Sequence, residues 1–138
     1  MGNSYRIFAT SGSKILGASI AKDLGKELGN LHMERFSDGE IFVRFEETIR
    51  GNTIFIIAQV NMPYNHLFEL YLTIDAARRA SAGEIICVLP YLPHSRQERR
   101  NGERVSIASR VVADFIQQSG ADRIITLDLH SEMIEGFY

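Results

Sequence analysis

The chain has 138 residues, of which 45% are hydrophobic and 23% are charged, and its formal net charge is −2. These values are typical of a single globular domain over residues 1–138, and they exclude a disordered chain, a collagen and a coiled coil. The balanced charge also argues against bulk binding of nucleic acid or of an anionic membrane, although it leaves room for a local basic patch.

Membrane insertion and disulfide bonding are both disfavoured by the sequence. The longest apolar runs, 54–58 and 85–91, are much shorter than the roughly 20 residues that span a bilayer. The single cysteine, Cys87, has no partner for an internal disulfide, and its apolar neighbours predict a buried, inert thiol. The first residues lack the basic and then apolar pattern of a secretory signal. We therefore expect a protein of the reducing cytoplasm, with no membrane or nucleic-acid partner.

The first predicted elements are a strand and a helix. Residues 5–9 form a short apolar run that predicts the strand. Residues 10–13 are rich in serine and threonine, which favour a turn and a helix N-cap. Over residues 14–28, leucine and isoleucine recur every four positions, which predicts a helix, and Gly29 is expected to cap its end.

A β-hairpin is predicted next. Apolar runs at 31–36 and 41–45 flank Asp38 and Gly39, a pair that favours a tight turn because both residues accept positive φ. After a second turn, residues 53–59 form an isoleucine-rich run that predicts another strand.

The second half of the chain continues to alternate helices and strands. Apolar residues recur at spacings of three and four over 67–82 and predict a helix. Residues 84–90 are continuously apolar, as in a strand that is buried on both faces. A polar loop over 91–104 is followed by a helical pattern at 105–119 and by a strand at 123–129.

This order of elements predicts an α/β fold, with a mostly parallel sheet flanked by helices and an added antiparallel hairpin. In such sheets, ligands bind outside the carboxyl ends of the strands. The candidate sites are therefore expected in three loops, at residues 10–14, 90–104 and 128–135.

The first loop, Thr10–Lys14, lies between a predicted strand and a predicted helix. Backbone N–H groups at the start of a helix can hold an anion, but the spacing of a phosphate-binding P-loop is missing here. Ordinary capping of the helix is the competing interpretation.

The second loop contains four arginines, Arg96, Arg99, Arg100 and Arg104. Guanidinium groups bind phosphate oxygens and stack on bases, so this loop is a candidate polyanion site. Interleaved glutamates leave open a solvated loop held by salt bridges. A free-standing phosphate- or RNA-binding module is a third interpretation, and the lack of interleaved aromatic residues argues against it.

Asp128 and His130 form the third candidate site. Residues two apart on a strand point the same way, so both side chains are expected on one face at the strand's exit. An imidazole beside a carboxylate can ligate a divalent ion, and a hydrogen-bonded structural pair is the alternative. The turn at 36–40 is interpreted as a hairpin turn, unless the ring of Phe36 stacks on a ligand.

Ten short segments along nearly the whole chain form an ordered set of motifs. They are Phe36–Glu40, Ile49–Gly51, Glu69–Leu70, Asp75–Ala76, Arg79–Ala82, Pro90–Tyr91, Ser95–Arg99, Gly120–Arg123, Asp128–His130 and Gly136–Phe137. Each segment alone is weak, but the combination in this order is highly specific. It resembles ribose-phosphate diphosphokinase, also called phosphoribosyl pyrophosphate (PRPP) synthase.

The resemblance implies a phosphoribosyltransferase-like α/β fold and a reaction that depends on Mg²⁺. In that reaction ATP gives its β,γ-diphosphate to ribose 5-phosphate, which yields PRPP and AMP. Such a transfer is mainly a matter of positioning and charge neutralisation, which requires a metal ion and cationic side chains around the phosphates. The resemblance also implies a homo-oligomer, since the family is usually hexameric.

Three sites follow from the resemblance. Positions that match the family's ATP site are Phe36, Asp38, Glu40, Arg96, Gln97 and Arg99. The position that matches the metal ligand is His130, and those that match the regulatory phosphate or ADP site are Thr48, Arg50, Ser81 and Arg104. By this resemblance, Phe36 and Arg96 enclose the adenine, and the two carboxylates reach the base from a neighbouring subunit.

The sequence departs from the family pattern at several positions and in length. Asn101 stands where many members have aspartate, His94 and Ser95 replace an aromatic-alanine pair, and Met133 and Glu135 stand where glutamine is usual. The resemblance covers only the first half of the usual chain, without the domain that holds ribose 5-phosphate and most catalytic residues. We therefore expect an N-terminal part of the enzyme that is inactive alone, and a non-catalytic regulatory subunit is the alternative.

Overall fold

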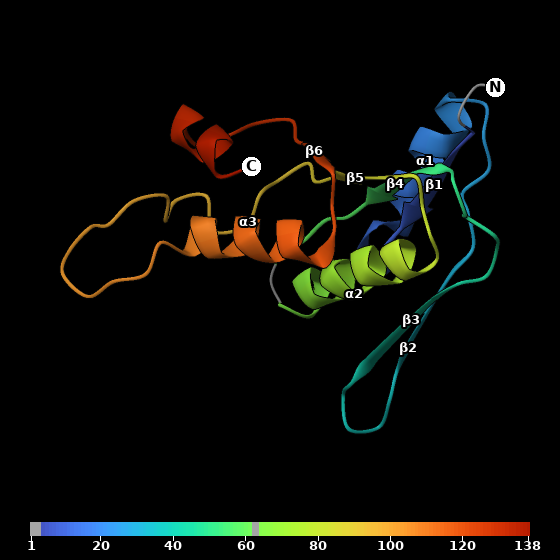
Figure 1. Ribbon diagram of the computed structural model, residues 1–138, viewed down its shortest axis with the longest axis horizontal. Coiled ribbons are helices and arrows are strands. Elements are labelled where there is room, and N and C mark those ends of the chain that lie inside the picture. The colour runs from blue at the N-terminus through green and yellow to red at the C-terminus, as the bar shows by residue number, and fades with distance from the viewer. Residues whose placement is uncertain (1–3, 62–63) are drawn as a thin grey trace.

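Four parallel strands form the main sheet in the computed structural model, which describes residues 4–61 and 64–138. The strands are β1 (Tyr5–Ala9), β4 (Thr53–Ile57), β5 (Glu84–Val88) and β6 (Arg123–Ile125), in the spatial order β1-β4-β5-β6 (Figure 1). The predicted parallel sheet is therefore confirmed. Its strands are rich in isoleucine, whose branched side chain suits a pleated, buried surface.

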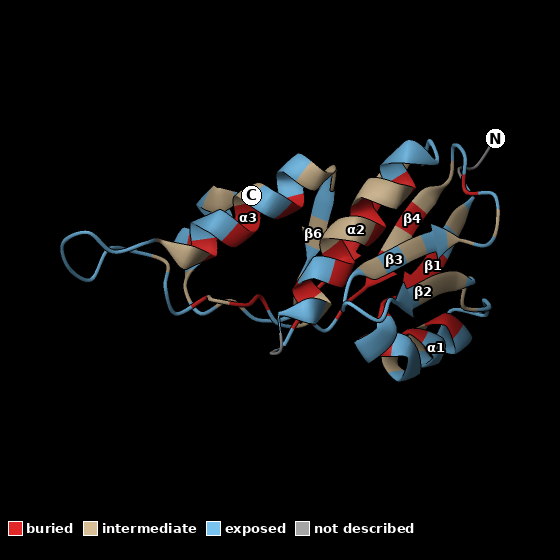
Figure 2. Ribbon diagram, turned by 90° about the horizontal axis from the view of Figure 1, so that it is seen from below, coloured by how far each residue is buried: buried red, intermediate tan, exposed pale blue. Residues whose placement is uncertain are grey.

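Helices cover both sides of this sheet. On one face lie α2 (Asn65–Arg79) and α3 (Ala108–Ser119), and α1 (Lys14–Asp23) lies on the other (Figure 2). A short 3₁₀ helix, η2 (Glu132–Phe137), packs against α3. Among the described residues, no helix has the length and the apolar character that crossing a bilayer requires.

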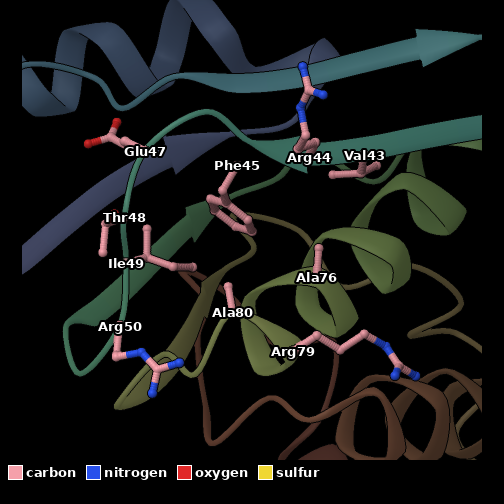
Figure 3. Close-up of a pocket in the computed structure, with 10 residues that line it drawn as sticks. All are labelled: Val43, Arg44, Phe45, Glu47, Thr48, Ile49, Arg50, Ala76, Arg79 and Ala80. Atoms are coloured by element: carbon pink, nitrogen blue, oxygen red, sulfur yellow. The ribbon is translucent and has the colours of Figure 1, made fainter.

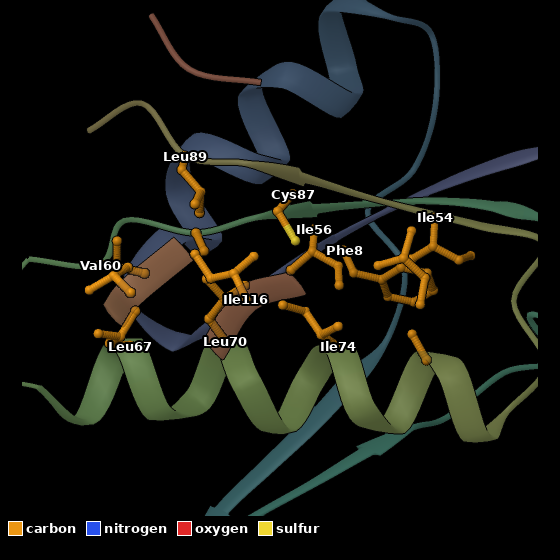
Figure 4. Packing of buried hydrophobic residues seen from close by; sticks show 14 of the residues in the cluster. Phe8, Ile54, Ile56, Val60, Leu67, Leu70, Ile74, Cys87, Leu89 and Ile116 are labelled. Carbon is orange, nitrogen blue, oxygen red and sulfur yellow. The ribbon is translucent and has the colours of Figure 1, made fainter. Parts of the chain in front are cut away.

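The main core lies between α2 and the sheet. The predicted apolar stripe of α2 is buried, and Leu70 and Ile74 are completely inaccessible to solvent (Figure 4). The strands contribute Phe8, Ile56 and Cys87 to the same core. This packing fixes the sheet, and with it the positions of the loops that leave the carboxyl ends of the strands.

A two-stranded antiparallel hairpin projects from this body (Figure 1). It consists of β2 (Leu31–Arg35) and β3 (Ile41–Phe45), as predicted, and its base is held by an edge-to-face contact between Phe45 and Phe8. The turn differs from the predicted one, because only Gly39 has positive φ (+93°). Gly39 N–H donates to the carbonyl of Phe36, so the chain forms a longer loop that ends on a left-handed glycine.

Helix α1 ends at Asp23, five residues before the predicted end. Gly25 takes φ +64°, and N–H groups of Gly25 and Lys26 donate to the carbonyls of Lys22 and Ala21, which is a Schellman cap. Gly29 is not the cap. It lies against the ring of Phe8, where a Cβ atom would come within 2.3 Å of a ring carbon, so a close approach requires this glycine.

Other element boundaries, such as the end of β6 and the start of α3, also differ from the prediction. β6 stops at Ile125 rather than at residue 129, because Ile125 pairs with Val88, the last residue of β5, and no other described strand pairs with β6. α3 begins at Ala108 rather than at residue 105, after a segment in which Arg104 has positive φ. Gly120, at φ +119°, ends α3 as predicted.

Candidate functional site

A pocket of about 200 Å³ lies between the loop that follows β5 and the loop that follows β6. Its lining residues are Pro90, Tyr91, Ser95, Arg96, Asp128, Leu129 and His130. The structure therefore brings together the first arginine of the cationic loop and both members of the predicted metal site. The pocket is at the carboxyl edge of the parallel sheet, where the topology predicts a ligand.

The cationic loop presents guanidinium groups that have few protein partners. Arg96, Arg99 and Arg100 are exposed, and within residues 4–61 and 64–138 none of them forms an ion pair. In this loop the described ion pair is Arg104 with Glu103, at 3.8 Å between two side chains that are mostly exposed. An exposed pair of this kind contributes little to stability. The loop therefore fits an anion site better than a loop held by salt bridges.

Backbone hydrogen bonds hold the start of this loop in place. The N–H of Gln97 donates to the carbonyl of His94 at 2.9 Å, and the N–H of Ser109 in α3 donates to the carbonyl of Gln97 at 3.1 Å. Ser95 is buried, and its hydroxyl donates to the carbonyl of Leu92. Arg96 lies between these fixed residues and lines the pocket, whereas Gln97 and Arg99 do not line it.

Asp128 and His130 reach the pocket from a loop, and not from a strand as predicted, because β6 ends at Ile125. Both residues are exposed, and they also line a wider, open depression next to the pocket. Two hydroxyls of this loop were missed by the sequence prediction. The Oγ1 atom of Thr126 and the Oγ atom of Ser131 are buried without a hydrogen-bond partner in the described structure.

The donor set at this loop fits a metal ion that is shared with a ligand. Within the described ranges, no three His, Cys, Asp or Glu side chains are grouped as a metal cage. Mg²⁺ commonly keeps several waters and binds one or two protein groups together with substrate phosphates. Asp128 and His130 suit that role, because they are two residues apart and line the same pocket as Arg96, which has no ion-pair partner among the described residues.

The hairpin residues of the predicted ATP site lie elsewhere. Phe36 is 44% exposed and packs against Phe42, with ring centroids 6.2 Å apart. Asp38 accepts the N–H of Glu40 at 3.0 Å, and both carboxylates are exposed. Figure 1 shows the hairpin and the loop over 90–104 projecting in different directions, and the described residues that line the pocket with Arg96 include none of the hairpin.

The residues assigned to the regulatory site are only partly gathered. Thr48 and Arg50 line a pocket of about 480 Å³ between the hairpin and the end of α2 (Figure 3). Ser81 adjoins it, because its carbonyl accepts the N–H of Gly51 at 2.8 Å. Arg104 lies in the distant cationic loop.

Two more arginines, Arg44 and Arg79, border the same pocket. Arg44 pairs with Glu46, and Arg79 pairs with Asp75, whose hydrogen bond and charge raise the pKa of Arg79. Both arginines are therefore engaged with carboxylates of their own element or its extension. Arg50 has no ion-pair partner among the described residues, and it is the cation that this pocket offers to an anion.

The loop over 10–14 forms neither of the two arrangements considered for its sequence, a side-chain cap of α1 or an anion site. The carboxylate of Glu69, which is buried in α2, accepts both the N–H and the hydroxyl of Ser11. Ser13 does not cap α1 but accepts the N–H of Gln59 at 2.6 Å. The helix start thus already faces a carboxylate, which would repel a second anion. A glutamate inside an apolar helical stripe was the available signal for this contact.

Cys87 is buried, as predicted, and is not a candidate nucleophile. Burial, with a smaller effect from the charge of Asp122, raises the pKa of its thiol to about 12. The reactive thiolate is therefore not populated at neutral pH.

Comparison with known proteins gives one consistent family. A family model described as the N-terminal domain of ribose phosphate pyrophosphokinase matches residues 5–120. The ribose-phosphate pyrophosphokinase of Agrobacterium fabrum is 45% identical over 134 residues, which are 96% of this chain and 43% of that protein. The Staphylococcus saprophyticus protein of the same name is 45% identical over 137 residues, 99% of this chain and 43% of its own length.

A solved structure shares the fold. The crystal structure of phosphoribosylpyrophosphate synthetase from Mycobacterium smegmatis matches with a TM-score of 0.94 at 37% identity. The match covers 99% of this chain and 46% of that chain. The present chain thus spans less than half the length of the relatives that it matches.

Proposed function

The chain belongs to the ribose-phosphate pyrophosphokinase family, whose N-terminal domain it matches, and on this premise we propose that it supplies the ATP-binding half of a PRPP-forming enzyme. The main support for the proposal is that Arg96, Asp128 and His130 line the same pocket. A free cation and metal-ligating groups at one sheet edge are what the phosphates of a nucleotide require.

The reaction proposed for the whole enzyme is a diphosphoryl transfer. The anomeric hydroxyl oxygen of ribose 5-phosphate bonds to the β-phosphorus of ATP, and the bond from that phosphorus to the α,β-bridging oxygen breaks. AMP leaves with the bonding electron pair, and the hydroxyl proton is released. This chemistry depends on alignment and on neutralising phosphate charge, rather than on a covalent protein intermediate.

In this proposal the cationic loop binds the nucleotide. The guanidinium of Arg96 stacks on the adenine, and Gln97 and Arg99 contact the nucleotide from the same loop. Two observations support these roles. The Arg96 and Arg99 side chains are exposed without an ion-pair partner in the described structure, and the backbone around Arg96 is fixed by hydrogen bonds.

Mg²⁺ would supply positive charge against the phosphate oxygens as negative charge develops on them. Asp128 and His130 would hold it, with the remaining positions taken by phosphate oxygens and water. The unpartnered hydroxyls of Thr126 and Ser131 add polar groups to the same loop and support a polar ligand there.

We propose that the adenine site is shared between two copies of the chain, in an assembly that is a hexamer in the family. Phe36 would close over the base, and Asp38 and Glu40 would accept its hydrogen bonds. The exposure of Phe36, and the fact that no hairpin residue is among the described residues lining the Arg96 pocket, support this arrangement. The pocket with Thr48, Arg50 and Ser81 would hold the regulatory phosphate or ADP, with Arg104 donated by another copy.

The isolated chain is expected to perform only part of this function. It would bind ATP but would not form PRPP, because it spans less than half the length of its relatives and the proposed ribose 5-phosphate site lies in the other part. The expected setting is the cytoplasm, which the single buried cysteine and the lack of any disulfide pairing within the chain support.

Titration with Mg²⁺-ATP, followed by calorimetry and by amide shifts, tests the nucleotide site. Arg96→Ala should weaken binding by about 1–3 kcal/mol, because a stacking and a charge-assisted contact are lost. Arg123→Ala is the matched control, since this exposed arginine pairs with Glu84 away from the pocket. Equal affinity of the two variants would remove Arg96 from the site.

The same samples test the activity of the chain. Incubation with Mg²⁺-ATP and ribose 5-phosphate should give no AMP, and sustained PRPP formation would contradict the proposed division of labour. The alternative, a non-catalytic regulatory subunit, would show no nucleotide affinity of its own and would bind a longer synthase chain.

A further inference from the structure

The turn that presents Arg96 begins at a residue with an unusual backbone. His94 has φ +61°, a left-handed conformation that side chains other than glycine rarely adopt. Its carbonyl accepts the N–H of Gln97, which closes a turn around Ser95 and Arg96. A backbone of this kind persists only where the surroundings hold it, so the contacts of His94 are informative.

The His94 ring stacks on Tyr64. The two rings are almost parallel, with an angle of 3° and centroids 5.6 Å apart. Tyr64 is itself fixed, because it directly precedes α2 and its carbonyl accepts the N–H of Phe68 at 3.0 Å. The stack therefore ties the turn to the start of α2, across a separation of 30 residues in sequence.

The other end of the turn is tied to the same histidine and to α3. The Nδ1 atom of His94 lies 3.3 Å from Nε2 of Gln97, within hydrogen-bond distance. The carbonyl of Gln97 accepts the N–H of Ser109 in the first turn of α3. Among these contacts, the ring of His94 is the one group that reaches both Tyr64 and Gln97.

We infer that His94, stacked on Tyr64, is a positioning residue that sets the direction in which Arg96 and Gln97 are offered to the nucleotide. The inference rests on the proposed nucleotide site and adds two residues to it that do not touch the ligand themselves. Without the stack, the turn keeps its backbone hydrogen bonds but loses its link to α2. The guanidinium then samples more directions, and binding has to pay for ordering it.

The first readout needs no ligand. Heteronuclear ¹H–¹⁵N NOE values at the Arg96 and Gln97 amides should fall in His94→Gly and in Tyr64→Ala, compared with the unmodified chain. Glycine accepts the positive φ, so the first substitution removes the ring without straining the backbone. Tyr64→Phe keeps two rings to stack and should keep the values high.

The second readout is the dissociation constant for Mg²⁺-ATP. Loss of the stack should raise it about two- to tenfold, as expected for an aromatic pair, and the double variant should be no worse than either single one. Tyr64→Phe should keep the affinity of the unmodified chain, because it keeps the stack and every contact of His94. Arg123→Ala, at an exposed arginine that pairs with Glu84 away from the pocket, is the control and should change neither readout.

Failure of this inference is separable from failure of the nucleotide site. If Tyr64→Ala leaves the amide NOE values and the ATP affinity unchanged while Arg96→Ala weakens binding, the site stands and the positioning role is wrong. If the turn loosens but no variant, Arg96→Ala included, changes ATP affinity, His94 orders the turn but the nucleotide site is wrong, which also overturns the positioning role.

Discussion

Phe8, Ile54, Ile56 and Cys87 are completely buried between the sheet and α2, whereas the arginines of the loop after β5 are exposed and mostly unpaired. The buried set can be exchanged only at a cost in stability, since it makes the contacts that hold the fold. The exposed set makes few such contacts, so its charge remains available to a ligand. Stability and ligand chemistry therefore lie on different residues of neighbouring elements, so substitutions should affect one without the other.

The largest effect is expected in the core. Leu70→Ala should lower the free energy of unfolding by about 2–5 kcal/mol, because it leaves a cavity under the sheet. Leu127→Ala removes the same atoms from a side chain that is 84% exposed and should change stability by less than about 0.5 kcal/mol. Denaturant unfolding of both variants measures the two losses of free energy. Similar losses would show that the buried Leu70 contributes no more to stability than an exposed leucine.

A smaller loss is expected at the buried carboxylate of Glu69, which joins α2 to the loop after β1. Glu69→Ala should cost about 1–3 kcal/mol, because the N–H and hydroxyl of Ser11 lose their acceptor. A double-variant cycle with Ser11→Ala should show that the two effects are not additive. Additive losses in denaturant unfolding would show that the contact does not link α2 to the loop after β1.

Alkaline pH should weaken the core through Cys87 and Tyr71. Burial raises the pKa of Cys87 from 9.0 to about 12 and that of Tyr71 from 10.0 to about 12. At pH values between the unfolded and the folded pKa, the unfolded chain has lost protons that the folded chain still holds. The contribution of these groups to the free energy of unfolding is therefore complete below pH 9 and falls as pH rises. The fully buried Cys87 contributes a slope of up to about 1.4 kcal/mol per pH unit, and the partly exposed Tyr71 contributes less because solvent screens it.

The variant Cys87→Ala isolates one of these groups. Its stability at neutral pH is lower because of the cavity, but its loss between pH 9 and 12 should be less steep than that of the unmodified chain. Equal slopes in unfolding experiments across this range would show that the thiol is not protected from ionisation.

The smallest effect is expected at the exposed edge. His130→Ala should leave the free energy of unfolding within about 0.5 kcal/mol of the unmodified chain, because the side chain is exposed. It should raise the Mg²⁺ concentration needed for half-maximal ATP binding about threefold, since one of several ligands is lost. Arg123→Ala serves as the control. An unchanged Mg²⁺ dependence would make His130 a structural residue only.

Apolar periodicity was enough to predict the order of strands and helices, because burial of apolar side chains determines these elements. It did not predict where they end. The early end of α1 depends on Gly25, and the glycine that was expected to cap it is needed for contact with Phe8. The short β6 depends on where its neighbour β5 stops, which the sequence of β6 does not encode.

For the candidate site, too, the sequence predicted the chemistry of the residues but not their arrangement. The residue types of the cationic loop and of Asp128 and His130 predicted anion and metal chemistry, and the topology predicted the sheet edge. Arg96, Asp128 and His130 line one pocket because of the conformation of their loops. The prediction had placed Asp128 and His130 by the alternation of a strand, but β6 ends before them, at Ile125. The contact of His94 with Tyr64 joins distant parts of the chain and left no local pattern to read, whereas that of Ser11 with Glu69 was signalled only by a glutamate inside an apolar helical stripe.

Co-expression of two defective chains tests whether the adenine site is shared between two copies. Phe36→Ala and Arg96→Ala should each weaken ATP binding when expressed alone. In a mixed assembly the intact ring of one chain meets the intact guanidinium of the other, so about a quarter of the sites should regain full affinity if the chains pair at random. Mixed assemblies that bind ATP no better than either variant alone would contradict a site built from two copies.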